Sequence, residues 1–473
     1  MGSKYPKSLR ISLPFWVLML EIAFILVFFF FTSYETPSKK LELLKPYPAF
    51  QDINVMAVLG LGFLKASLRR YTWSSVAFNL FTLALGVQWA IILDGFLFSS
   101  SRKIPINIQR IILGTMSAMS ALISSGATLG KVNLVQLIVM TLLEVTAFLG
   151  TKKLTLTFLD GNEHQSMMQI HVFGAYFGVA ATWCLSGPGL SAAKEKEQRA
   201  TASSLFTTLG TLFLWIFWPT FNSALLEYPS EKETAIYNTY YALAVSAVVA
   251  MSFSAAAHPH GKISMIHVHR ATLAGGVAVG VATNLIHSPW IAMVLGLLAG
   301  MISIVGAKCL PGCFNRIIGL HDTCEVHSTF GLPGLLGGLA YILLMIEQAS
   351  WTKLSTVGFQ ILYSAGSLSL SVAMGLAGGI LTGRYDPHWL FSSVFKKINL
   401  ILPCVCVCVC VCVCVCTVYY YCYFITQHIF YHLLYHILYI VIHIHYIHLY
   451  LSYIHILYKC PKSLSAAVSI TDP

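Results

Sequence analysis

The stretch MQIHVFGAYFGVAATWCL, residues 168–185, is long and apolar enough to cross a bilayer, yet it contains the ionisable side chain of His171. An ionisable ring in hydrocarbon is costly unless it lines a cavity or meets a partner, so such a residue indicates a functional site. The alternative is a histidine that packs between helices and bonds to a neighbour. A second stretch, HDTCEVHSTFGLPGLLGGLAYILL at residues 321–344, has the same layout, with Phe330 at the corresponding place.

An acidic residue precedes each of these rings by the same interval, Glu163 before His171 and Asp322 before Phe330. Matched segments in the two halves of a membrane protein predict an internal repeat with a site near mid-membrane. Carboxylates at these positions also suit helix N-termini, where the helix dipole and the free backbone N–H groups stabilise them. We therefore favour a structural role for both acidic residues over direct contact with a solute.

The composition is that of a membrane protein. The chain has 473 residues, of which 57% are hydrophobic and 10% charged, and its mean hydropathy is +0.73. Soluble domains carry roughly 25% charged residues. Apolar runs of about 20 residues predict transmembrane helices, not the shorter alternating strands of a β-barrel. We predict an all-α polytopic membrane protein with about twelve spans, at residues 14–34, 51–68, 73–98, 106–129, 132–150, 167–186, 205–226, 237–257, 268–286, 289–307, 328–347 and 356–383.

The basic residues indicate the orientation of the chain. Lysine and arginine between residues 4 and 10 precede the first apolar run, which places the N-terminus in the cytoplasm by the positive-inside rule. Alternation of the spans then places residue 384 onward, and basic residues such as Lys65 and Arg270, on the cytoplasmic side. The net charge of +11 follows from this topology, so no nucleic-acid partner is predicted.

The character of the chain changes near residue 383. Residues 1–383 are predicted to form one transmembrane domain, whereas residues 384–473 hold a Cys-Val repeat at 404–416 and a Tyr/His/Ile-rich run at 418–458. Clustered Cys and His are metal ligands, but alternate cysteines lack the C-x-x-C spacing of zinc sites. A TG dinucleotide repeat encodes alternating Cys and Val. We interpret this aberrant tail as read-through or a gene-model artefact, and we predict no metal site.

Two further residues of the predicted domain are candidates for function. Cys309, in KCLPGC at a cytoplasmic helix end, is a candidate for reversible palmitoylation, with a buried or free thiol as the alternative. Phe221 lies near a proline at the outer end of a span, where aromatic belts explain most rings and a gating ring over a pore is the alternative. No nucleophile–base pair, phosphate loop or metal-ligand spacing appears in residues 1–383, so no enzymatic activity or cofactor is predicted.

Several stretches are highly specific when they are taken together. They include LFLWIFWPTFNSALL at residues 212–226, AHPHGKISMIHVHRATLAGGVAVG at 257–280 and HDTCEVHSTFGLPGLLGG at 321–338. Over about residues 1–383 the chain resembles the Rh family within the ammonium transporter superfamily. Because it contains no Asn-x-Ser/Thr sequon, it is most similar to the non-glycosylated Rh blood group polypeptides of red cells.

The resemblance implies an ammonium-transporter-like fold with inverted repeats, and a trimer with one pore per subunit. Transporting members of the family conduct ammonia, with carbon dioxide as a further candidate, past twin histidines beneath two stacked phenylalanines. Carried onto this chain, His171 matches the first histidine and Phe330 stands in place of the second. Phe221 matches one gate phenylalanine, and Ser125, aligned through GATLGKV, stands in place of the other.

Glu163 and Asp322 match the acidic residues that support the pore in the family. Because two of the four pore-lining residues depart from the conducting pattern, the resemblance implies a subunit of the red-cell Rh complex in the plasma membrane. Its implied partners are membrane lipids, a second copy or the Rh-associated glycoprotein in a homo- or heterotrimer, and the cytoskeletal adaptor ankyrin. The alternative is a channel that conducts neutral ammonia past His171 alone.

Overall fold

The computed structural model describes residues 13–35, 45–68, 71–99, 103–185, 201–317, 320–348 and 354–383. The aberrant tail at 384–473 lies outside the described residues, so its interpretation stays a prediction. The elements in chain order are α1 (Leu13–Phe31), β1 (Thr32–Tyr34), α3 (Tyr47–Val55), η2 (Met56–Gly60), α4 (Leu61–Leu64), η3 (Lys65–Ser67), α5 (Thr72–Phe98), β2 (Ile104–Ile106), α6 (Ile108–Ala127), α7 (Leu134–Phe158), α8 (Glu163–Met168), α9 (Ile170–Leu185), α10 (Thr201–Ser223), α11 (Pro229–Ala256), α12 (Met265–Gly280), α13 (Pro289–Ile317), η5 (His327–Gly331), α14 (Leu332–Gln348) and α15 (Leu354–Gly383).

Each of the twelve predicted spans corresponds to a helix or a run of helices in the described residues. Ten of these are long and apolar enough to cross a membrane by length and composition. The other two are α6 and α12, which are buried along most of their length. A helix that faces only other helices needs less apolar surface than one that faces lipid, which explains why both helices contain threonine and arginine. The predicted all-α membrane fold is confirmed.

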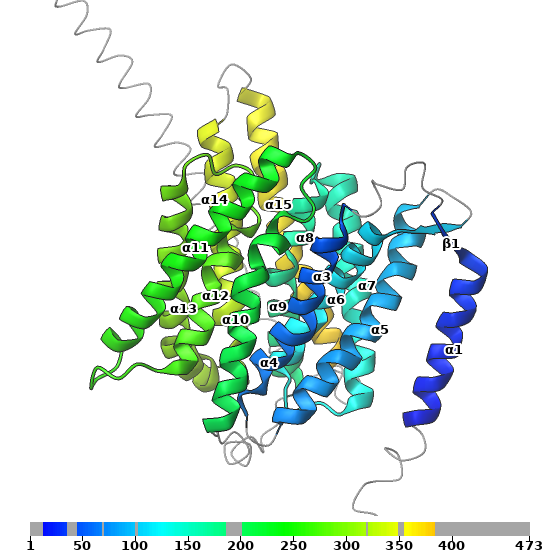
Figure 1. Ribbon diagram of the computed structural model, residues 1–473, viewed down its shortest axis with the longest axis horizontal. Coiled ribbons are helices and arrows are strands. Elements are labelled where there is room, and N and C mark those ends of the chain that lie inside the picture. The colour runs from blue at the N-terminus through cyan, green and yellow to red at the C-terminus, as the bar shows by residue number, and fades with distance from the viewer. Residues whose placement is uncertain are drawn as a thin grey trace, which may run out of the picture. The chain divides into compact units, whose positions relative to one another are not determined.

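The first helix is attached to the rest of the bundle on one side only. Figure 1 shows α1 at an edge, beside α5, and Phe24 of α1 stacks on Trp89 of α5 with ring centroids 5.8 Å apart. Its other face exposes large apolar side chains such as Trp16 and Phe29. Strand β1 follows α1 directly and pairs in parallel with β2, which joins α1 to the connection between α5 and α6. An apolar face of this kind is suited to lipid.

The two matched stretches of the sequence form interrupted helices that lie against each other. The first breaks at Gln169 between α8 and α9, and the second begins with the π-helical turn η5 before α14. Irregular backbone at membrane depth is tolerated where protein surrounds it or where it lines a cavity. A Cβ added to Gly334 would lie 2.6 Å from Val172 Cγ2, so α9 and α14 are in close contact. The two stretches are therefore neighbours in space.

Close approach of backbones also joins α6 to α9 in the centre of the bundle. A Cβ added to Gly178 would lie 2.7 Å from the Cα atom of Ser124. Small residues at such contacts let membrane helices pack closely. Two names are used below for the two ends of the bundle. The 'Asp94 end' is the end at which α5 and α7 terminate, and the 'Lys65 end' is the end at which α5 and α7 start.

Candidate functional site

A row of aromatic rings surrounds His171 in the centre of the bundle. His171 lies in the first turn of α9 and is 2% exposed. Its ring centroid lies 5.7 Å from that of Phe221 and 6.0 Å from that of Phe330. These three side chains, which we call the ring row, come from α10, α9 and η5. Three of the predicted pore-lining residues are thus brought together.

The tautomer of His171 follows from its one hydrogen bond in the described structure. Its Nδ1 lies 3.2 Å from the carbonyl oxygen of Met168. A carbonyl only accepts, so Nδ1 carries the proton and donates, which leaves Nε2 as an acceptor. The first imidazole of the expected pair is therefore placed and oriented as a hydrogen-bonding group.

Phe330 packs directly beside this imidazole. Its ring is almost parallel to that of His171, at an interplanar angle of 12°, and it is buried in η5. Aromatic rings in contact have centroids about 4.5–7 Å apart, so the two rings touch. A phenyl ring offers no hydrogen bond to replace the water that a polar solute sheds, which raises the cost of passage.

Trp218 also contacts His171, and it was not among the residues predicted from the sequence. Its ring stacks with that of His171, with centroids 5.6 Å apart and an interplanar angle of 21°. Its indole N–H has no hydrogen-bond partner among the described residues. The signal was present, because Trp218 precedes Phe221 by three residues, and residues three apart lie on the same face of a helix.

Ser125 does not pair with Phe221, and that expectation is wrong. Ser125 accepts a hydrogen bond of 2.8 Å from the ammonium of Lys65. Thr220, next to Phe221, instead donates to Asp52 at 2.8 Å. Asp52 and Lys65 belong to one helical run and are about 20 Å apart at a rise of about 1.5 Å per residue. Ser125 is therefore near the Lys65 end, whereas Phe221 is near the Asp94 end.

Glu163 belongs to a network of ion pairs at the Asp94 end. It begins α8, and its carboxylate lies 2.9 Å from the ammonium of Lys152. Lys152 also lies 3.4 Å from Asp94, which in turn lies 3.6 Å from Arg110. The network ties α5, α6, α7 and α8 together. The carboxylate of Glu163 is compensated by a lysine, which fits the structural role favoured from the sequence.

Asp322 caps the π-helical turn that carries Phe330. Its carboxylate accepts a hydrogen bond of 2.9 Å from the backbone N–H of His327. Burial raises the pKa of Asp322 above its usual value, while hydrogen bonds from the backbone of His327 and Val326 oppose that rise. Asp322 thus holds the backbone of η5, and neither acidic residue contacts the ring row in the interactions described.

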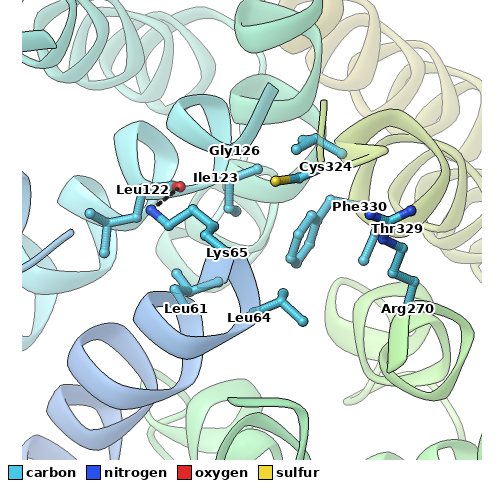
Figure 2. A pocket seen from close by; sticks show the side chains of 11 residues that line it. Leu61, Leu64, Lys65, Leu122, Ile123, Gly126, Arg270, Cys324, Thr329 and Phe330 are labelled. Atoms are coloured by element: carbon cyan, nitrogen blue, oxygen red, sulfur yellow. Dashed lines mark hydrogen bonds between the residues drawn. The ribbon is translucent and has the colours of Figure 1, made fainter. Parts of the chain in front are cut away.

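A small cavity lies beside Phe330, between this ring and Lys65 (Figure 2). Its volume of about 20 Å³ is enough for one water-sized molecule. Apolar side chains form much of its wall, together with two cationic ones. The lining includes Leu61, Leu64, Lys65, Leu122, Arg270 and Phe330.

The two cationic residues are buried in the bundle, and their predicted place on the cytoplasmic side stays a prediction. Lys65 and Arg270 are each 6% exposed. Arg270 forms an ion pair with Glu325, whose backbone has the left-handed φ of 51°. Alternation of the spans places both residues toward the cytoplasmic side but does not say whether a side chain is exposed or buried there. Burial of an ionisable residue inside a membrane protein is itself a sign of function.

The predicted palmitoylation site is accessible. Cys309 lies on α13 with an exposed side chain. By contrast, burial raises the pKa of the Cys324 thiol to about 11. A thiol with such a pKa is protonated and unreactive near neutral pH. Modification of Cys309 stays a prediction.

The fold and the ring row define a multi-pass membrane protein with a buried row of aromatic rings inside its helix bundle. The sequence matches the profile described as Ammonium Transporter Family over residues 16–386. The chain therefore belongs to the ammonium transporter family. Within it, the chain is of the Rh type, as two sets of relatives indicate.

Several curated relatives are Rh polypeptides of primates. The RH-like protein of Macaca mulatta is 56% identical over 386 residues, which cover 81% of this chain and 92% of the relative. The Blood group Rh(CE) polypeptide of Homo sapiens is 54% identical over 386 residues, with the same coverage of 81% and 92%. The chain thus aligns with nearly the whole length of these proteins.

The solved structures agree with the family assignment. One, described as Nitrosomonas europaea Rh50 and mechanism of conduction by Rhesus protein family of channels, has a TM-score of 0.63 and 28% identity, and covers 78% of this chain and 98% of its own. A second, a Sensor Amt Protein, has a TM-score of 0.58 at 20% identity and covers 72% and 92%, which shows the fold alone.

Proposed function

We propose that this chain is an Rh-type subunit of a membrane complex whose own conduit is closed to ammonia. The stack of Phe330 on His171, with centroids 6.0 Å apart, carries this proposal. A small polar solute needs a hydrogen-bonding path through an apolar passage, because the loss of hydration is otherwise not repaid. His171 offers one acceptor, and the phenyl ring beside it offers none.

The proposed complex is a trimer in the red-cell plasma membrane, formed with the Rh-associated glycoprotein or with further copies of this chain. The primate relatives named as blood group polypeptides support this role. The exposed apolar faces of the outer helices provide surfaces for lipids and for neighbouring subunits. The N-terminus and residue 384 onward are proposed to be cytoplasmic, where an adaptor such as ankyrin has access to them.

Ammonia entry into proteoliposomes tests the closed conduit. Vesicles that hold the full chain and an internal pH dye are mixed with an ammonium salt in a stopped-flow instrument, beside empty vesicles and vesicles with the Nitrosomonas europaea Rh50 channel. The closed conduit predicts alkalinisation at the rate of empty vesicles. Faster alkalinisation, above that of empty vesicles, would overturn the proposal.

A second candidate function is a channel for neutral ammonia. The acceptor Nε2 of His171 favours it, together with the retained ring of Phe221. This candidate predicts that His171→Ala abolishes an influx that the unmodified chain supports. The subunit role predicts instead that the chain co-purifies with the Rh-associated glycoprotein when both are expressed, and that His171→Ala leaves the ammonia influx unchanged.

A further inference from the structure

A residue with a strained backbone lies shortly before the ring that is proposed to close the conduit. Glu325 has the left-handed φ of 51°, and η5 with Phe330 begins two residues after it. A side chain at such a φ brings Cβ too close to a carbonyl oxygen, so a residue other than glycine stays there only when its surroundings hold it. Contacts outside its own backbone must therefore hold Glu325 in this conformation.

The backbone of Glu325 is also the starting point of η5. Its carbonyl oxygen accepts hydrogen bonds from the backbone N–H of Thr329 at 3.1 Å and from the Thr329 hydroxyl at 3.0 Å. The hydroxyl of Ser328 donates to the same oxygen at 3.0 Å. Thr329 directly precedes Phe330 in the chain. The direction of this one carbonyl therefore helps to set the place of the Phe330 ring.

The side chain of Glu325 is held from a separate helix. It forms an ion pair with Arg270 of α12, and the side chains are 19% and 8% exposed. Arg270 lines the same small cavity as Thr329 and Phe330 (Figure 2). This ion pair is the one that Arg270 makes among the described residues.

Helix α12 is a rigid support for this contact. A Cβ added to Gly276 would lie 2.8 Å from Cδ1 of Trp218, whose ring stacks with that of His171. The helix is buried along most of its length. Arg270 thus connects Glu325 to the same packed unit that supports the ring row, and a break in a buried ion pair is costly because it leaves a charge uncompensated.

We propose that Arg270 is a positioning residue, which holds Glu325 in its left-handed conformation and thereby keeps Phe330 stacked on His171. Without the ion pair, Glu325 relaxes to an ordinary φ, its carbonyl turns, and Phe330 leaves His171. The left-handed penalty favours the relaxed backbone by on the order of 10-fold. This inference rests on the proposed closure, because it names what holds the closing ring.

Cryo-electron microscopy of the full chain in lipid nanodiscs tests the inference through the distance between the two rings. The variants are Arg270→Met, Arg270→Lys, and Arg270→Met combined with Glu325→Gly. Lysine keeps the ion pair, whereas methionine removes it. Glycine adopts the left-handed conformation without a penalty, so the double variant removes the ion pair together with the strain that it opposes. Arg270→Gln replaces Arg270→Met if the methionine variant elutes as aggregate in size-exclusion chromatography.

The unmodified chain, Arg270→Lys and the double variant are expected to keep the ring centroids of His171 and Phe330 near 6.0 Å. In Arg270→Met most particles should show these centroids more than about 7 Å apart, beyond aromatic contact. Glu325 should have a negative φ in the same particles.

Rings that stay in contact in Arg270→Met would overturn the inference, as would rings that separate equally in the double variant. Stopped-flow ammonia entry into proteoliposomes distinguishes this failure from that of the proposed function. Influx through the unmodified chain with its rings in contact would overturn the proposed closure alone, because the ring distance would still test the role of Arg270.

Discussion

Replacement of Lys152 by methionine is expected to destabilise the fold far more than replacement of its partner Glu163 by glutamine. The side chain of Lys152 is 1% exposed, and its ammonium contacts both Glu163 and Asp94. Glu163 is 46% exposed, whereas Asp94 is nearly buried. The two carboxylates therefore depend on the lysine to different extents.

The expected magnitudes follow from these exposures. Removal of one partner from a buried ion pair costs roughly 3–5 kcal/mol, because the remaining charge is left uncompensated. Arg110 stays 3.6 Å from Asp94, so we expect a loss near the lower end for Lys152→Met, about 3 kcal/mol. Solvated ion pairs contribute about 0.2–1 kcal/mol. Glu163→Gln keeps the pair of Lys152 with Asp94, and we expect a loss of about 0.5 kcal/mol.

Equilibrium unfolding in mixed micelles, followed by tryptophan fluorescence during titration with a denaturing detergent, measures both variants. The free energy of unfolding should separate them by about 2 kcal/mol or more. Equal losses would refute the reasoning, because Glu163 would then carry as much of the network as Lys152. A neutral Lys152→Met would show that the network contributes nothing.

The remaining predictions concern single contacts. Gly178→Ala should destabilise the bundle by roughly 1–3 kcal/mol through overpacking, because its Cβ would lie 2.7 Å from Ser124 Cα. Gly150→Ala is the control and should not destabilise it, because a Cβ at Gly150 would meet no atom within 4 Å. Equal unfolding midpoints for the two variants would contradict this. Desolvation raises the pKa of the half-buried Cys324 to about 11. Its thiol should therefore react with a maleimide more slowly than that of the exposed Cys309 near neutral pH, as peptide mass spectrometry would measure; equal rates would refute this. The raised pKa of Asp322 means that its carboxyl ionises first in the unfolded chain, so this group should cost stability as pH rises above 3.8. Asp322→Asn keeps an acceptor for His327 and should remove that part of the pH dependence of unfolding, and an unchanged pH profile would contradict it.

Much of the fold could be predicted because hydrophobic length is a strong signal in membranes. The apolar runs predicted the twelve helical units, and the equal spacing of Glu163 with His171 and Asp322 with Phe330 predicted that two stretches belong to one site. His171, Phe221 and Phe330 do meet. These features depend on local composition or on a repeated interval, both of which a sequence displays directly.

The level of Ser125 and the burial of Lys65 and Arg270 could not be predicted, because they depend on which turn of one helix faces which turn of another. The motif that located Ser125 fixes the last turn of α6 but not the level at which α6 passes Phe221. Lys65 and Arg270 lie near the ends of apolar runs, where a cation at the membrane surface and a buried one look alike. Only the packing of α4, α6 and α12 around the cavity distinguishes them.

The geometry of the two rings at the centre of the conduit is the most direct test of the closed conduit. A cryo-electron microscopy structure of the full chain in lipid nanodiscs with ammonium chloride measures it. A closed conduit predicts the rings of His171 and Phe330 near 6.0 Å apart and almost parallel, with no density between them. Separated rings, with solute density between them and continuous with the cavity beside Phe330, would contradict it.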